Sequence, residues 1–94
     1  MDFEFEWDDV KAESNLRKHG VSFNEAASAV ADGRARVKPD PDHSMFEDRA
    51  RVLGFSDKNR LLLSVVRARG SAIRIISARK ATRSESRWYA KDQD

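Results

Sequence analysis

Residues 73–89 read IRIISARKATRSESRWY, and this stretch decides how the rest of the chain is arranged. Its first half is rich in isoleucine and is typical of a buried strand. In its second half Thr82 and Glu85 have the spacing of a capping box, which predicts a helix to about residue 90. The stretch carries five Lys/Arg and one acid. A strand that runs into a basic helix indicates a surface for a polyanion.

The bulk composition predicts one small domain. The chain has 94 residues, and no linker or internal repeat divides it. We expect a single domain over residues 1–94, with residues 90–94 as a frayed tail. The absence of cysteine excludes disulfides and thiolate metal sites. The acidic N-terminus does not resemble a secretory signal, and no apolar run is long enough to span a bilayer, so we expect a cytoplasmic protein without membrane contact.

The net charge of +2 hides an asymmetry between the two halves of the chain. Residues 1–48 hold 6 Lys/Arg and 12 Asp/Glu, whereas residues 49–94 hold 12 Lys/Arg and 4 Asp/Glu. A basic half indicates a nucleic acid or an acidic protein as the partner. The alternative is that the two halves neutralise each other within the fold.

Periodicity and capping signals define the elements of the first half. Residues 3–7 alternate aromatic and acidic side chains, which predicts a half-buried strand with its acids toward solvent. Asp8 or Asp9 then caps a helix that ends at Gly20, with a weak apolar stripe of Ala12, Leu16 and the His19 ring. The capping box of Ser22 and Glu25 begins a second helix, which ends at Asp32-Gly33.

The second half reads as strands joined by short turns. Consecutive strands with such turns pair as an antiparallel meander, and the two early helices must cover one face of that sheet. The prolines at 39 and 41 oppose regular pairing in the loop 39–44. The prediction is an α+β fold: an N-terminal strand, two helices, an antiparallel three- to four-stranded meander and a C-terminal helix. The meander strands are expected at 35–38, 49–55, 61–68 and 72–78.

Arg74 lies between two isoleucines in a predicted central strand and therefore needs a partner. Regular alternation puts Arg74 and Ile76 on one face, and the other face receives Ile73, Ile75, Ser77 and Arg79. A guanidinium group suits a carboxylate or a phosphate equally, because its planar fork donates two parallel hydrogen bonds. The partner of Arg74 is thus an acid such as Glu13 or Glu47, or a bound phosphate.

Other side chains offer weaker signals. Arg79, Lys80 and Arg83 gather at a helix N-terminus, where backbone N–H groups favour an anion, although such clusters are often only solvated. Trp7 and Trp88 are better explained as packing residues than as base-stacking platforms.

Two histidines are candidate functional groups. His19 either ends a helix or acts as a general acid or base, since imidazole titrates near neutrality. Asp40, Asp42 and His43 share a loop, but no further ligand completes a metal site, and we predict no metal.

Three stretches resemble the BrnT toxins of bacterial type II toxin–antitoxin systems. They are FEWDDVKAESNLRKHGVSFNEAA at 5–27, PDPDHS at 39–44 and GSAIRIISARKATRSESRWY at 70–89. They cover most of the chain in the family's order. The resemblance implies a RelE-like α+β fold and a ribonuclease that arrests translation. It also implies a BrnA-type antitoxin, whose complex with the toxin binds and represses its own promoter DNA.

Metal-free RNA cleavage needs a base, cations that stabilise the pentacoordinate phosphate, and an acid. We predict an electrostatic site of Arg69, Arg74 and Arg79, with His19 or Tyr89 moving protons and no cofactor. A cationic neighbourhood would lower the pKa of the tyrosine. The alternative functions are a non-catalytic nucleic-acid-binding module on the same basic face, or an antitoxin docking surface. The predicted RNA-binding side chains are Lys18, Lys80, Arg83 and Arg87.

Overall fold

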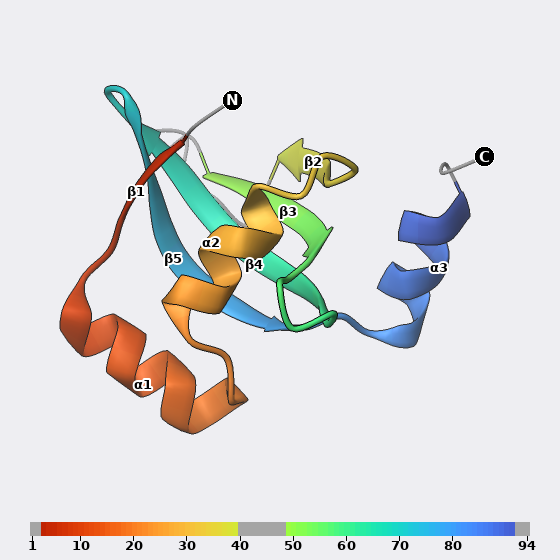
Figure 1. Ribbon diagram of the computed structural model, residues 1–94, viewed down its shortest axis with the longest axis horizontal. Coiled ribbons are helices and arrows are strands. Elements are labelled where there is room, and N and C mark those ends of the chain that lie inside the picture. The colour runs from red at the N-terminus through yellow and green to blue at the C-terminus, as the bar shows by residue number, and fades with distance from the viewer. Residues whose placement is uncertain (1–2, 40–48, 92–94) are drawn as a thin grey trace.

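The structure is a computed structural model that describes residues 3–39 and 49–91. Its five strands form one sheet, in the order β1-β5-β4-β3-β2, and α1 and α2 pack on one face of it, while α3 stands at the other (Figure 1). The elements are β1 (Glu4–Glu6), α1 (Asp9–His19), α2 (Phe23–Val30), β2 (Arg36–Pro39), β3 (Arg49–Phe55), β4 (Leu61–Arg69), β5 (Ala72–Lys80) and α3 (Arg83–Lys91).

The predicted α+β fold and element order are confirmed. Strands β2 to β5 form the expected antiparallel meander, and β1 joins the edge of β5 in parallel, a pairing that the sequence did not predict. Pro39 was expected in a loop, but it pairs with Ala50 at the end of edge strand β2. Helix α3 continues through Lys91, so residues 90 and 91 are helical rather than frayed. In the described part of the chain, no helix has the length and apolar character that crossing a membrane requires.

The two faces of the sheet bury different clusters. The larger cluster lies under α1 and α2 and includes Phe23, Leu62 and Ile75. The smaller cluster joins Leu53 and Leu63 to α3. Most of the apolar burial thus lies on the face covered by α1 and α2. Much of the second face, on which α3 packs, is left to polar side chains.

A bulge in β5 changes which side chains share a face. Val65 of β4 pairs with Ser77, but the next residue, Val66, pairs with Ile75, so Ile76 is an extra residue in β5. An extra residue shifts the alternation by one position. The prediction that Arg74 and Arg79 point to opposite faces is therefore wrong, because both lie on the second face.

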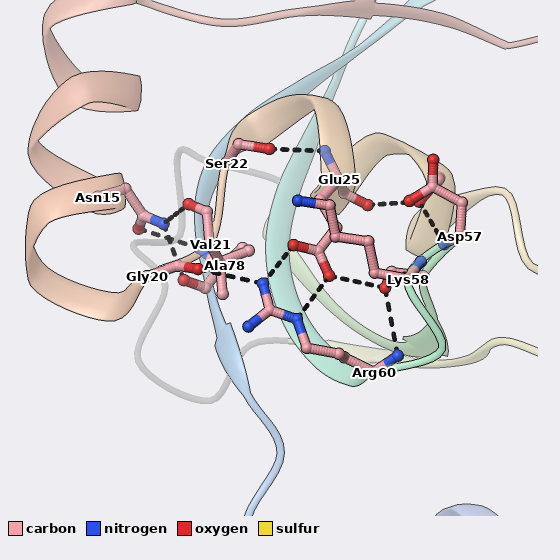
Figure 2. Close-up of polar contacts among 11 residues, drawn as sticks. Asn15, Gly20, Val21, Ser22, Glu25, Asp57, Lys58, Arg60 and Ala78 are labelled. Carbon is pink, nitrogen blue, oxygen red and sulfur yellow. Dashed lines mark hydrogen bonds and ion pairs between the residues drawn. The ribbon is translucent and has the colours of Figure 1, made fainter.

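Helix α1 begins and ends as its sequence predicts. The Asp8 carboxylate accepts a hydrogen bond from the Lys11 N–H group, and Gly20 ends the helix with a φ of 70°. The predicted apolar stripe is wrong, because Leu16 is 49% exposed and the buried residue of α1 is Asn15. Its amide donates to the carbonyls of Val21 and Ala78 and accepts from the Ala78 N–H group (Figure 2).

Helix α2 has only half of the predicted capping box. The Ser22 hydroxyl accepts from the Glu25 N–H group, but the Glu25 carboxylate turns away to Arg60 (Figure 2). It also accepts a hydrogen bond from the Ser56 hydroxyl. Arg60 Nε lies 2.8 Å from Glu25 Oε2, and Nη2 donates to the other carboxylate oxygen and to the Gly20 carbonyl. The hydrogen bond from Arg60 lowers the pKa of Glu25 despite its burial. This contact ties α2 and the end of α1 to the β3–β4 turn.

Replacing Arg60 by alanine should lower the free energy of unfolding. The Glu25 side chain is 1% exposed, so the substitution leaves a buried carboxylate without its cation, at a cost of about 3–5 kcal/mol. The exposed Arg17–Glu13 pair provides the control, and Arg17→Ala should cost no more than about 1 kcal/mol. Urea unfolding at pH 7 measures both. Equal losses of stability in the two variants would show that the Arg60–Glu25 contact stabilises the fold no more than an exposed ion pair does.

Candidate active site

The second face of the sheet carries a row of arginines at equivalent positions. Arg49 of β3 lies opposite Arg67 of β4, and Arg67 lies opposite Arg74 of β5. Glu6 of β1 continues this row beyond Arg74. Like charges at directly opposed positions repel each other, and stability alone does not favour such an arrangement. We call Arg49, Arg67 and Arg74 the arginine row.

Neighbouring positions extend the positive charge over the same face. Lys38 lies opposite Arg51, Arg36 lies opposite Leu53, and Arg79 lies opposite Leu63. We call the whole set the basic face, and it draws on β2, β3, β4 and β5. Its members are Arg36, Lys38, Arg49, Arg51, Arg67, Arg69, Arg74 and Arg79.

Glu6 holds two arginines of this face. Its Oε2 atom lies 2.8 Å from Arg74 Nη1 and 3.5 Å from Arg69 Nη1. An acid partner for Arg74 was one of the predicted options, but Glu13 is not that acid, because it pairs with Arg17. Glu47 lies outside the described residues. Sequence reasoning missed Glu6 because the acids of the first strand were predicted to point to solvent. The parallel pairing of β1 with β5, which brings Glu6 beside Arg74, was not predicted.

Arg79 is fixed by a fork to the first turn of α3. Its Nη1 and Nη2 atoms lie 2.9 Å and 3.0 Å from the two carboxylate oxygens of Glu85. The predicted capping box is complete here: the Thr82 N–H group donates to Glu85, and the Glu85 N–H group donates to the Thr82 hydroxyl. The hydrogen bond from Arg79 lowers the pKa of Glu85 to about 2. The Glu85 carboxylate thus binds the guanidinium group of Arg79, which was expected to bind an external anion.

Tyr89 lies in α3 but does not face the cations. Its side chain is buried, its ring meets Phe55 edge-on at 5.3 Å between centroids, and its hydroxyl donates to Asp32 Oδ2 at 2.9 Å. Burial and the bond to Asp32 raise the pKa of Tyr89. The expected lowering by positive charge is therefore wrong.

Asp32 links Tyr89 to the sheet. Burial favours its neutral form, but hydrogen bonds from the backbone N–H groups of Phe55 and Arg34 and from Tyr89 outweigh that effect, and the pKa of Asp32 is lowered. The Asp32-Gly33 pair was predicted as a helix stop, and the helix ends just before it at Val30. The Asp32 carboxylate also holds α3 against β3, because it accepts hydrogen bonds from Tyr89 of α3 and from the Phe55 N–H group of β3.

His19 lies apart from the arginine row. It sits in the last turn of α1 and lines a pocket of about 230 Å³ with Lys18 and, from β5, Ser77. Ser77 follows Arg74 by three residues, so this pocket opens farther along β5. Lys80, Arg83 and Arg87 are exposed.

Sequence reasoning also missed five cations of the basic face. They stand in β2, β3 and β4, and the alternation of the segment RARVLGF was a signal for two of them. The missed cations are Arg36, Lys38, Arg49, Arg51 and Arg67. Within residues 3–39 and 49–91, no three His, Cys, Asp or Glu side chains are grouped so as to hold a metal ion. The loop with Asp40, Asp42 and His43 lies outside the described residues.

The Arg79–Glu85 fork makes stability depend on acid pH. The folded-state pKa of Glu85 is about 2 against an ordinary 4.5, so its stabilisation is present above about pH 4.5 and is lost as the pH falls toward 2. Glu85→Gln should lower the free energy of unfolding at pH 7 by roughly 2 kcal/mol, and this difference should shrink near pH 2.5. Urea titrations at both pH values measure it. Glu13→Gln, in an exposed pair, should show little change at either pH; a constant deficit for Glu85→Gln would contradict the assignment.

Comparison with known proteins identifies the family. The family model described as the ribonuclease toxin BrnT of type II toxin–antitoxin systems matches residues 7–85. The crystal structure of the Brucella abortus ribonuclease toxin BrnT is similar at 25% sequence identity and a TM-score of 0.68, and the match covers 87% of this chain and 100% of that one. No curated protein matched the sequence. The chain therefore belongs to the BrnT family of ribonuclease toxins of type II toxin–antitoxin systems, and with that family it is an endoribonuclease.

Proposed function

We propose that the chain cleaves RNA on its basic face without a metal ion and thereby inhibits translation. The observation that carries this proposal is the arginine row with Glu6 at its end. Guanidinium groups at opposed positions repel each other. A bound phosphodiester neutralises their positive charge and so reduces this repulsion. They supply the positive charge that a metal ion supplies in other phosphoryl-transfer enzymes.

The reaction that fits this face is attack by a ribose 2′-oxygen on the neighbouring phosphorus. The 2′-oxygen–phosphorus bond forms, and the bond from phosphorus to the 5′-oxygen of the next nucleotide breaks. Arg69 and Arg74 stabilise the extra negative charge of the pentacoordinate phosphate, whereas Arg79 remains in its fork with Glu85. The products are a 2′,3′-cyclic phosphate and a 5′-hydroxyl group.

Proton transfer is assigned to one side chain and to solvent. Glu6 takes the proton of the 2′-hydroxyl, because its carboxylate contacts Arg74 of the arginine row and its side chain is 36% exposed. Water at this exposed face returns a proton to the leaving 5′-oxygen, because His19 lines a pocket farther along β5. Of the two proton carriers predicted from the sequence, His19 lines an open pocket beside β5, whereas Tyr89 is buried with a raised pKa. Tyr89 is accordingly a positioning residue for α3, and Lys18, Lys80, Arg83 and Arg87 guide the RNA.

We also propose that a BrnA-type antitoxin neutralises the enzyme in the cytoplasm. Family membership supports such a partner, and a basic face suits an acidic protein segment that competes with RNA. In this proposal the two proteins form a hetero-oligomer that binds promoter DNA through the antitoxin.

Arg74→Ala should abolish most RNA cleavage. Losing one preorganised cation at the phosphate should lower kcat by roughly 10²- to 10³-fold. The assay follows the cleavage of a short single-stranded RNA in EDTA, where the wild type should stay active. Arg17→Ala, an exposed position on α1, should cleave like the wild type. Full activity of a folded Arg74→Ala variant, or loss of wild-type activity in EDTA, would refute the proposed site or its metal independence.

Glu6→Gln tests the proton acceptor. Glutamine keeps the size of the side chain and can still accept a hydrogen bond from Arg74, but it takes up no proton. We expect kcat to fall by roughly 10²- to 10⁴-fold. Glu4→Gln is the matched control, because Glu4 is two residues away on the same strand. A Glu6→Gln enzyme with the wild-type kcat would assign Glu6 a structural role only.

A further inference from the structure

A pocket of about 220 Å³ opens on the basic face between α3 and strands β2, β3 and β4. It combines an apolar wall with cations, and none of the catalytic roles assigned above uses it. Arg51, on its wall, follows Arg49 by two positions in β3, a distance of roughly 7 Å along a strand. The pocket therefore lies next to the Arg49 end of the arginine row, two strands across from Arg74.

The apolar wall consists of Leu53, Leu63 and Trp88. The indole ring is held in place by Arg36, whose Cζ atom lies 3.6 Å from the ring centroid and whose guanidinium also donates to the Trp88 carbonyl. Lys38 Nζ lies 4.7 Å from the same centroid. A ring fixed in this way offers a preformed surface for another flat ring.

The polar part of the pocket favours an anion beside that flat ring. Lys38 and Arg51 bring positive charge, while the carboxylate of Glu85 is already neutralised by its fork to Arg79. Ser84 adds an exposed hydroxyl. An aromatic wall with cations beside it is the arrangement in which proteins bind one unstacked base and its phosphate.

We propose that this pocket binds one unpaired base of the RNA substrate, with a preference for a purine, and thereby selects the cleavage position. The inference rests on the proposed function, because the base enters the pocket only when its neighbouring phosphate lies on the arginine row. A purine is favoured over a pyrimidine because its larger ring covers more of the half-exposed Trp88 indole. Lys38 and Arg51 bind the phosphate of the selected nucleotide.

Filling the pocket tests this inference while Trp88, Lys38 and Arg51 stay in place. Ser84→Phe places a ring into the pocket from the exposed side of α3, and Ser86→Phe adds the same ring to an exposed position that does not line it. The substrates are a short RNA with a purine beside the cleaved bond and the same RNA with an abasic ribose there. In the wild type and in Ser86→Phe, the abasic substitution should lower kcat/KM by roughly 5- to 150-fold, the effect of one base–aromatic contact.

In Ser84→Phe the two RNAs should be cleaved at equal rates, close to that of the wild type on the abasic RNA. The inference is overturned if the wild type cleaves both RNAs equally, or if Ser84→Phe keeps the wild-type difference. It is also overturned if Ser84→Phe escapes neutralisation by an antitoxin but keeps the difference, because the pocket would then receive a protein. Absence of any cleavage that depends on Arg74 would instead refute the proposed function itself.

Trp88 fluorescence provides a second measurement that needs no cleavage. In a Trp7→Phe background Trp88 is the sole tryptophan. A 2′-deoxy purine dinucleotide, which the enzyme cannot cleave, should quench its emission in a saturable manner, and Ser84→Phe should remove that quenching while Ser86→Phe should not. Equal quenching in all three proteins would overturn the inference.

Discussion

Repulsion between Arg49, Arg67 and Arg74 is the constraint around which the rest of the molecule is arranged. Three cations at directly opposed positions of neighbouring strands oppose the pairing of those strands. Apolar burial under α1 and α2 on the opposite face offsets that cost, together with the contacts that Arg49 and Arg67 make and the pairing of Arg74 with Glu6. Functional sites are expected where an arrangement costs stability. Here the costly arrangement is a row of like charges, and RNA cleavage requires such positive charge to stabilise the phosphate.

The sequence predicted the parts of the fold that depend on neighbours along the chain. Asp8 and Gly20 bound the first helix, and Thr82 with Glu85 forms a complete capping box, because such signals act within one turn. The meander followed from turns a few residues long. The same local rules failed where a distant partner competes for a side chain: the Glu25 carboxylate binds Arg60 rather than the start of its own helix.

Only part of the basic face was predictable from the sequence, and its arrangement was not. Arg69 and Arg79 were predicted at strand ends and Arg74 inside a strand, yet the face that Arg74 and Arg79 share depends on Ile76, and a bulge has no reliable signature in sequence. Glu6 became visible only through the parallel pairing of β1 with β5, which joins residues nearly 70 positions apart. Tyr89 was misjudged because its surroundings come from Asp32 and Phe55, far away in sequence.

The bulge makes this site sensitive to the length of β5 as well as to its composition. Arg74 and Arg79 are separated by an odd number of positions, and they share a face only because Ile76 takes up one of them without pairing. Removing Ile76 would leave them an even number of positions apart in a regular strand, so they would still share a face, whereas adding one paired residue between them would turn one guanidinium group toward the apolar core. The chain therefore encodes its positive surface partly as a count of residues, and an insertion can disrupt it where most substitutions at the same positions cannot.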